Sequence, residues 1–228
     1  MSSSVVLIVL NVLLFIPAVI LHEVSHGYMA LMLGDTTARD AGRLTLNPIA
    51  HVDLWGTIVL PLMMFLVAGF AIGYAKPVPI DPRRMTRVPY QTALLLTGAA
   101  GPVTNVLLAI ASGICFRIVG ALGAPIIVQY IFGFFTFINL VLAFFNLVPI
   151  PPLDGSRVVQ YFLKGDALRA YASLERWGIV IVLALVFILP QILPSFDLIG
   201  AYFRATVYPL AQFLAGPQLM SVLARVLG

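Results

Sequence analysis

The sequence predicts an all-α polytopic membrane protein with about five to six transmembrane helices, and with short extended or re-entrant segments near a candidate active site. Of its 228 residues, 61% are hydrophobic and only 10% are charged, and the mean hydropathy is +1.05. A soluble domain of this length could not hide so much apolar surface from water. Several uncharged runs also reach the ~20 residues that a helix needs to cross a bilayer.

The apolar runs define the helices expected along the chain. They cover residues 4–33, 54–74, 88–119, 126–148, 174–189 and 198–227. Runs that cross lipid must be helical, because lipid offers the backbone no hydrogen-bond partners. We expect kinks or ends at Pro61, Pro190, Pro194 and Pro209. No polar stretch suits a separate soluble domain, so we expect one membrane-embedded domain over 1–228, with a core at 4–165 and C-terminal helices at 171–227.

Two polar stretches are expected to be extended. Residues 42–48 alternate in polarity over a short length, which is typical of a strand and turn. Residues 76–82 contain three prolines, which exclude a helix.

The pattern His-Glu-Val-Ser-His at residues 22–26 lies in the inner part of the first apolar run. Residues i and i+4 of a helix differ by about 40° around its axis and ~6 Å along it, so His22 and His26 can bind one metal ion from the same face. Glu23 flanks that position and can take a proton from a bound water. The alternative is a set of buried side chains satisfied by neighbouring helices. However, an ionised group at the bilayer centre costs about 2.5–3.5 kcal/mol, which favours a metal site.

A catalytic zinc ion usually has three protein ligands, so this pattern lacks one. We choose Asp154, because it follows an apolar run that ends in three prolines, which extend the backbone and aim the carboxylate. The alternative for Asp154 is a loop residue that caps the following helix. His51 and Asp53 compete for the ligand position and rank below it. They could instead lie behind the ligands or order the loop.

These motifs together resemble the site-2 protease family of intramembrane zinc metalloproteases. The resemblance rests on residues 22–26 and on residues 146–155, which read Asn-Leu-Val-Pro-Ile-Pro-Pro-Leu-Asp-Gly. Residues 101–105 and 73–79 are similar to further motifs of compact bacterial and archaeal members. The similarity extends over 12–157. We expect the compact form of the family, without a PDZ-like or nucleotide-sensing domain.

The resemblance implies one Zn²⁺ per chain, bound by His22, His26 and Asp154. It also implies that Glu23 acts as general base and general acid, and that Asn146 contacts the substrate carbonyl or the scissile strand. The alternative for Asn146 is a helix cap.

Three further residues are candidates for substrate binding. Asn105 could bond to the substrate or pack against the catalytic helix. Asn47 and Lys76 lie in the two stretches expected to be extended, and these stretches could present an edge to which an unwound substrate adds as a strand. The alternative is that both stretches are ordinary connecting loops.

The expected metal ligands must lie at one depth in the membrane. If every apolar run crossed, the helices at 4–33 and 126–148 would run in opposite directions and carry the ligands to opposite faces. We therefore predict that residues 54–74 enter the membrane and return without crossing. All basic residues but Arg117 and Arg204 then share one side, which places the N-terminus outside and the site nearer the cytoplasm. The larger group comprises Arg39, Arg43, Lys76, Arg83, Arg84, Arg87, Arg157, Lys164, Arg169, Arg176 and Arg225.

The expected function is that of an intramembrane zinc endopeptidase. It would hydrolyse peptide bonds within or near transmembrane segments of other membrane proteins, in regulated intramembrane proteolysis or in clearance of signal-peptide remnants. Its expected partners are these substrates and the lipid bilayer, and not nucleic acid, because the net charge of +4 is explained by membrane topology. We expect a multi-pass protein of a bacterial or archaeal cytoplasmic membrane.

Two other functions are compatible with the motifs. A membrane metal-ion transporter would need sites along a path, whereas the sequence has one compact cluster of candidate ligands. A non-catalytic zinc-binding membrane scaffold would not need Glu23, which is intact.

Overall fold

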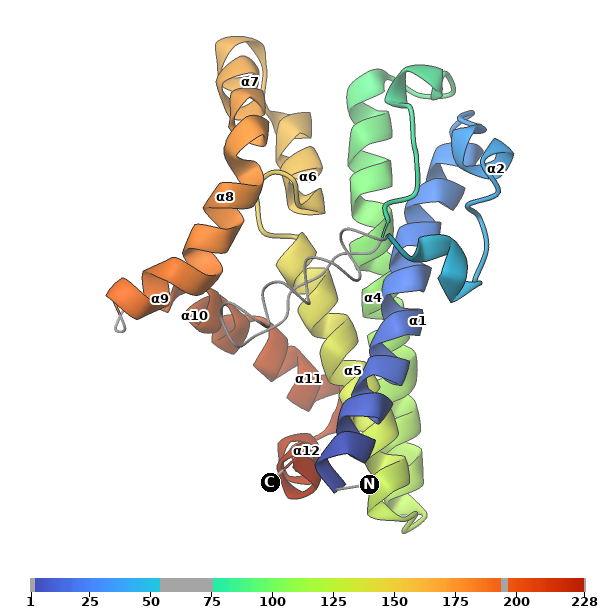
Figure 1. The fold of residues 1–228 in the computed structure, drawn as a ribbon, viewed down its shortest axis with the longest axis vertical. Coiled ribbons are helices and arrows are strands. Elements are labelled where there is room, and N and C mark those ends of the chain that lie inside the picture. Colours follow the sequence, from blue (N-terminus) through green and yellow to red (C-terminus); the bar gives the residue numbers. More distant parts are fainter. Residues whose placement is uncertain (1–2, 54–75, 194–196, 228) are drawn as a thin grey trace.

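The computed structural model describes residues 3–53, 76–193 and 197–227, and it is built from helices (Figure 1). Three long helices form its centre: α1 (Ser3–Met32), α4 (Tyr90–Ala121) and α5 (Ile126–Asn146). Each agrees to within two residues with a predicted apolar run. The described residues contain no strand, so the all-α fold class is confirmed.

Shorter helices connect and flank these three. The α-helices are α2 (Thr37–Asp40), α6 (Asp154–Phe162), α7 (Gly165–Ala172), α8 (Gly178–Leu183), α9 (Leu189–Ile192), α10 (Leu198–Ala205), α11 (Val207–Ala215) and α12 (Gln218–Leu227). The 3-10 helices are η1 (Pro48–His51), η3 (Pro82–Arg84) and η4 (Ser173–Trp177), and η5 (Ala184–Ile188) is π-helical.

Four helical stretches of the described residues are long and apolar enough to cross a membrane. They are Val5–Met32, Tyr90–Ala121, Ile126–Asn146 and Gly165–Ile192, and the last is composed of α7, η4, α8, η5 and α9. The prediction of a polytopic membrane protein is therefore confirmed. The segment 54–74, which we expect to be re-entrant, lies outside the described residues.

α1 and α5 run in the same direction, and α4 runs against them (Figure 1). α4 packs against both. The N-terminus therefore lies at the same end of the bundle as the α4–α5 turn, where Gly123 adopts φ +66°. Elsewhere, the backbone N–H of Lys76 donates to the carbonyl of His51 at 2.9 Å. The segment that begins at Lys76 therefore lies next to η1.

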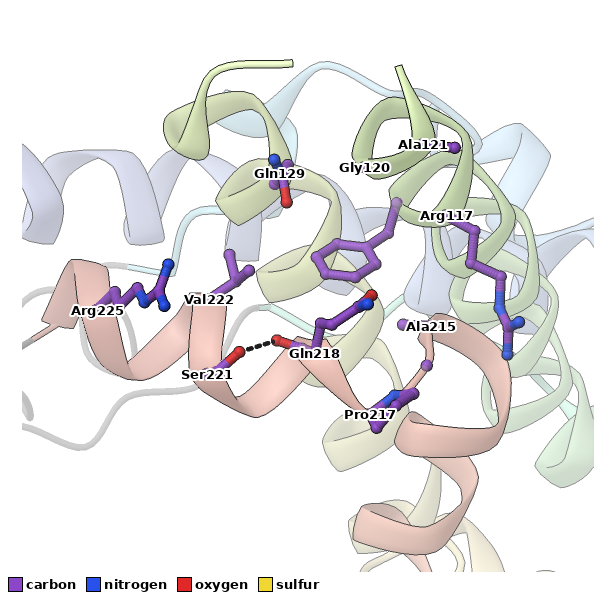
Figure 2. Close-up of a pocket in the computed structure, with 12 residues that line it drawn as sticks. Arg117, Gly120, Ala121, Gln129, Ala215, Pro217, Gln218, Ser221, Val222 and Arg225 are labelled. Carbon is purple, nitrogen blue, oxygen red and sulfur yellow. Dashed lines mark hydrogen bonds between the residues drawn. The ribbon is translucent and has the colours of Figure 1, made fainter. Parts of the chain in front are cut away.

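The predicted run 198–227 forms three short helices instead of one continuous helix. α11 ends at Ala215, and Gly216 then adopts φ +96°, which side chains rarely allow, so the chain turns before α12. Arg225 consequently lines the same pocket as Arg117, beside the α4–α5 turn (Figure 2). The prediction that Arg225 lies with the larger basic group was wrong, because it assumed that this run crosses the membrane.

The strand predicted over residues 42–48 does not form. The residues after Gly42 are irregular and lead into η1, where the Asn47 side chain accepts a hydrogen bond from the backbone N–H of Ile49 at 3.1 Å. Residues 76–81 are irregular as well. The backbone bond from Lys76 reaches His51 in η1, beyond the stretch 42–48, whereas a ladder needs repeated backbone pairs between the two stretches.

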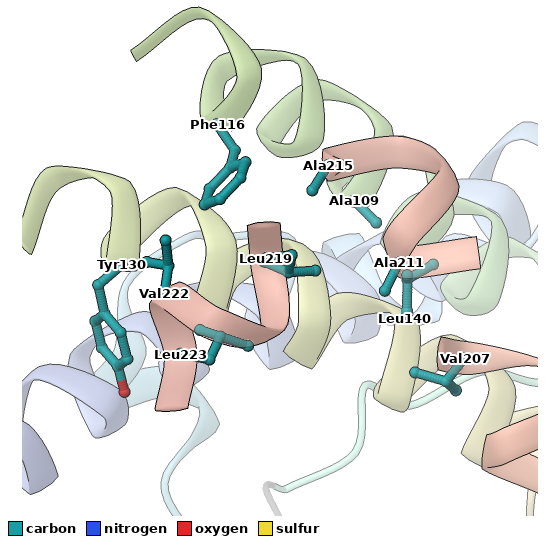
Figure 3. Close-up of a cluster of buried hydrophobic side chains, with 10 residues drawn as sticks. All are labelled: Ala109, Phe116, Tyr130, Leu140, Val207, Ala211, Ala215, Leu219, Val222 and Leu223. Carbon is teal, nitrogen blue, oxygen red and sulfur yellow. The ribbon is translucent and has the colours of Figure 1, made fainter. Parts of the chain in front are cut away.

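A buried apolar cluster joins α4 and α5 to α11 and α12 (Figure 3). Its members are Ala109, Phe116, Tyr130, Leu140, Val207, Ala211, Ala215, Leu219, Val222 and Leu223. Gly133 on α5 permits the close approach, because a Cβ there would lie 2.8 Å from the Leu219 side chain and 3.0 Å from the Phe116 ring. The C-terminal helices therefore share their core with the two central spans.

Candidate metal centre

Three side chains from distant parts of the sequence converge beside α4. His22 and His26 lie one turn apart on α1, and their Nε2 atoms are 3.1 Å apart. Asp154 is the first residue of α6, and its Oδ2 lies 3.1 Å from His22 Nε2 and 3.2 Å from His26 Nε2. None of the three side chains is more than 13% exposed. Among the described residues, this is the group of His, Cys, Asp and Glu donors that could share a metal ion.

A chain of hydrogen bonds fixes which ring nitrogen of each histidine carries the proton. The Asn139 side-chain N–H donates to a carbonyl of its own helix at 2.8 Å, so its Oδ1 accepts from the Asn105 side chain at 2.7 Å. Asn105 Oδ1 therefore accepts from the Nδ1–H of His22 at 2.5 Å. The Nδ1–H of His26 donates to the carbonyl of Thr97 at 2.6 Å. Both Nε2 atoms are left with lone pairs that face the centre of the triangle.

Asp154 is placed by close packing of the segment that follows α5. A Cβ on Gly155 would collide with the carbonyl of Leu147, so glycine at this position lets the first turn of α6 approach the end of α5. Gly178, at the start of α8, contacts the carbonyl of Pro151 in the same way. The Asp-Gly pair therefore combines a candidate ligand with the glycine that allows α6 to lie close to the end of α5.

The spacing of the three donor atoms fits a tetrahedral zinc ion. Zinc ligands of this kind lie ~2.0–2.1 Å from the ion, and therefore ~3.3–3.4 Å from one another. The observed separations of 3.1–3.2 Å are close to this value. Two imidazole nitrogens and one carboxylate oxygen also form a donor set that zinc accepts.

The surroundings of the triangle favour a cation as well. Gly101 on α4 keeps the space beside the rings open, because a Cβ there would lie 2.6 Å from His22 Nε2. Two lone pairs and a carboxylate thus face one another in a buried space, and a bound cation would satisfy all three.

Comparison with known proteins agrees with this geometry. The family model described as Peptidase family M50 matches residues 116–189, which include Asp154. A Bacillus subtilis protein named "Putative zinc metalloprotease YwhC" is 39% identical over 171 residues, which cover 72% of this chain and 74% of the relative. The chain belongs to peptidase family M50, the site-2 protease family. It is an integral membrane protein.

Other relatives are more distant. A Mycolicibacterium smegmatis protein named "Putative zinc metalloprotease Rip2" is 29% identical over 169 residues, which cover 73% of this chain but 62% of that relative. A Methanocaldococcus jannaschii protein named "Putative zinc metalloprotease MJ0611" is 46% identical over 63 residues, or 27% of this chain and 31% of the relative. No solved structure matches the chain significantly.

In this M50 protein, the candidate base Glu23 is contacted by the segment 76–81. The backbone N–H of Val78 donates to Glu23 Oε2 at 3.4 Å. Val78 itself is buried against α1, where Gly27 leaves room for it, because a Cβ on Gly27 would lie 2.7 Å from the Val78 side chain. The segment 76–81 therefore lies directly against the helix that carries His22 and His26.

Two buried polar side chains fix this segment. The Asp35 carboxylate accepts hydrogen bonds from the backbone N–H of Asp81 at 2.6 Å and from that of Thr37 at 2.9 Å. The Arg43 guanidinium donates to the carbonyl of Lys76 at 2.9 Å. Both ends of the segment are thus attached to the chain that directly follows α1.

Three residues were expected to contact substrate, and two of them lie at the ends of helices. Asn146 is the last residue of α5, and its side-chain N–H donates to the carbonyl of Leu142 at 3.0 Å. Asn47 is exposed and caps η1. Lys76 is exposed in the irregular segment 76–81.

The remaining candidates lie behind or beside the triangle. Asn105 is fully buried, and its side chain bonds to His22 from behind the ring. His51 is buried in η1, and its Nε2–H donates to the carbonyl of Thr45 at 2.9 Å. Asp53 is the last described residue before the gap at 54–75. In the described ranges, neither His51 nor Asp53 belongs to the group of donors that could share a metal.

Three residues of the site were not among the sequence candidates. Asn139 ends the hydrogen-bond chain to His22, Gly101 leaves space for the triangle, and Asp35 holds the segment over Glu23. Asn139 could have been found, because an amide in an otherwise apolar helix needs a partner within the membrane. The other two depend on contacts that no local pattern indicates.

Proposed function

We propose that this M50 protein is an intramembrane zinc endopeptidase that hydrolyses peptide bonds within or near the transmembrane segments of other membrane proteins. Such cleavage would serve regulated intramembrane proteolysis or the clearance of signal-peptide remnants. One observation supports the proposal above all: two imidazole Nε2 atoms and one carboxylate oxygen meet within 3.2 Å, buried between helices that are long and apolar enough to span a membrane.

In this proposal, each residue of the site has one role. His22, His26 and Asp154 hold one Zn²⁺, which when bound polarises a peptide carbonyl and lowers the pKa of a water molecule to about 7. Glu23 takes a proton from the attacking water and returns it to the leaving amine. Asn105 holds the His22 ring in the tautomer that ligates metal. We propose this role and not a bond to substrate, because the Asn105 side chain already bonds to His22.

An apolar groove beside the metal centre suits a substrate that comes from lipid. The groove has a volume of about 480 Å³ and lies between faces of α1 and α4 and residues 44–46. Exposed side chains of Tyr28, Met32 and Val103 line it. Asn47 and Lys76 would contact an unwound substrate from the irregular stretches, and Asn146 would contact it from the end of α5.

The arrangement of helices supports a site nearer the cytoplasmic face of a bacterial or archaeal cytoplasmic membrane. α1 and α5 run in the same direction (Figure 1). The late part of α1, which carries His22 and His26, and the segment after α5, which carries Asp154, therefore lie toward the same end of the bundle. Ten of the 13 basic residues lie between α1 and α4 or between α5 and α8, whereas Arg117 and Arg225 line one pocket near the α4–α5 turn. The positive-inside rule then assigns the ligand end to the cytoplasm.

Replacing Glu23 by glutamine tests the proposal. The variant removes the proton acceptor but none of the three donors, so we expect kcat to fall at least about 100-fold while zinc content stays at one ion per chain. The chain's other glutamate, the exposed Glu175 of η4, provides a matched control as Glu175→Gln. Cleavage of membrane-span peptides in liposomes is followed by mass mapping of the cut sites, with and without a chelator.

The same liposomes separate the proposal from its alternatives. Zinc flux without proteolysis by the wild type would assign the site to transport. Zinc binding with neither flux nor cleavage would assign it to a scaffold. Normal turnover by Glu23→Gln would contradict the role of the glutamate.

A further inference from the structure

A second polar site lies far from the metal centre. A cavity of about 660 Å³ opens between the end of α4, the beginning of α5 and α12 (Figure 2). α4 contributes Gly101 to the metal centre and Arg117 to this cavity. These positions are 16 residues apart, which is ~24 Å along a helix, so the cavity lies near the opposite membrane face.

The cavity is lined by hydrogen-bond donors and positive charge. Two arginines, Arg117 and Arg225, line it together with Gln129, Gln218 and Ser221, and none of the described residues that line it is an aspartate or glutamate. The Arg117 guanidinium donates to the carbonyl of Leu214 at 2.6 Å, which fixes one charge at its edge. The exposed Arg225 has no ion-pair partner in the described part of the chain.

The helix that carries Arg225 is short and packs against α5. α12 has 10 residues, or ~15 Å of helix, which is too short to cross. It buries Leu219 and Leu223 in the apolar cluster shared with α4 and α5 (Figure 3), whereas Ser221 and Arg225 face the cavity. Its apolar face is thus covered by the protein, and its polar face lies beside the α4–α5 turn, at the end of two helices that are long and apolar enough to span a membrane.

We propose that this cavity binds the phosphate of an anionic phospholipid head group. The Arg225 guanidinium has no carboxylate beside it among the described residues and favours an anion, and Arg117 adds positive charge at the other end of the cavity (Figure 2). The cavity lies at the end of two helices that are long and apolar enough to span a membrane, which favours a lipid as the source of the anion. The volume is also within the range of small-ligand pockets. A zwitterionic lipid would bring a quaternary ammonium group that finds no carboxylate in the cavity lining.

Native mass spectrometry of the full-length protein in detergent tests this proposal. The probes are phosphatidylglycerol and phosphatidylcholine with the same acyl chains, added in equal amounts. We expect wild-type protein to retain more phosphatidylglycerol, and Arg225→Gln to lower that preference about fivefold, because one basic residue near an anionic head group is lost. Arg225→Lys should keep most of the preference. Arg176→Gln, on the exposed turn η4, removes the same charge elsewhere and should change nothing.

Three results would overturn the proposal. The first is an unchanged preference for phosphatidylglycerol in Arg225→Gln, and the second is an equal loss in Arg176→Gln. The third is displacement of phosphatidylglycerol from wild-type protein by millimolar inorganic phosphate, which would assign the cavity to a soluble anion. Because Arg225 is exposed and outside the apolar cluster, its variants should fold like the wild type.

Discussion

Replacing Gly101 by alanine tests whether the buried triangle is a metal site. In the interior of a helix such as α4, this change ordinarily stabilises a protein by about 0.5–1 kcal/mol. Here the new Cβ would lie 2.5 Å from His22 Cε1 and 2.6 Å from His22 Nε2, and closer still to His26 Nε2. These distances are about 1 Å inside the ~3.5 Å at which non-bonded heavy atoms attract one another most.

The imidazole rings cannot yield to the new methyl group without losing their supports. Asn105 holds the Nδ1–H of His22, and the Thr97 carbonyl holds that of His26. Loss of one such support typically lowers metal affinity 10–100-fold, and Gly101→Ala disturbs both rings at once. We therefore expect zinc affinity to fall by at least about 100-fold.

The assay measures zinc per chain after equilibration with a buffered free zinc concentration. Gly120→Ala is the matched control, because it lies on the same helix and its Cβ would meet only Gln129 Oε1, at 3.9 Å. Wild type and control should hold one zinc ion, and Gly101→Ala should hold almost none while retaining its helical circular dichroism. Stoichiometric zinc in Gly101→Ala at wild-type affinity would refute the metal site and the roles built on it.

Two further substitutions test the supports of the site. Asn139→Leu removes the last amide of the hydrogen-bond chain, so zinc affinity should fall about 10–100-fold in a zinc titration although no ligand changes; unchanged affinity would mean that the chain does not position the ring. Asp35→Asn presents an N–H to the backbone N–H of Asp81, so kcat for peptide cleavage should fall while zinc content stays at one per chain. The exposed Asp40→Asn should leave kcat unchanged, and equal effects of the two substitutions would argue against a positioning role for Asp35.

The sequence indicated the central helices and the donor triangle because both depend on simple physical patterns. Long apolar runs cross lipid as helices, and the i, i+4 spacing of His22 and His26 places both rings on one face. The approach of Asp154 could be inferred from its motif and from the requirement of equal depth. The bond between Asn105 and Asn139 could not, because it joins two helices whose relative rotation is set by packing along their whole length.

Two local predictions failed because the backbone followed a constraint that polarity does not reveal. The run 198–227 is apolar enough to cross, but the positive φ of Gly216 turns the chain and places Arg225 beside Arg117. The stretch 42–48 alternates like a strand, but its contact with Lys76 is through the Arg43 side chain, and the backbone bond of Lys76 goes to His51 in η1. In both cases tertiary context decided the conformation.

The loop before Asp154 satisfies a requirement that lipid imposes on any irregular backbone. α5 ends at Asn146, while His22 and His26 lie well before the end of α1, so residues 147–153 are non-helical close to the depth of the candidate site. Each buried backbone N–H left there without a hydrogen-bond partner would lower the stability of the fold by about 1–3 kcal/mol. Three of the seven residues are prolines and have no N–H, and the N–H groups of the other four donate to carbonyls between 143 and 150. The proline-rich segment therefore does more than aim Asp154, because it allows the helix to stop beside the metal centre without leaving a donor unpaired.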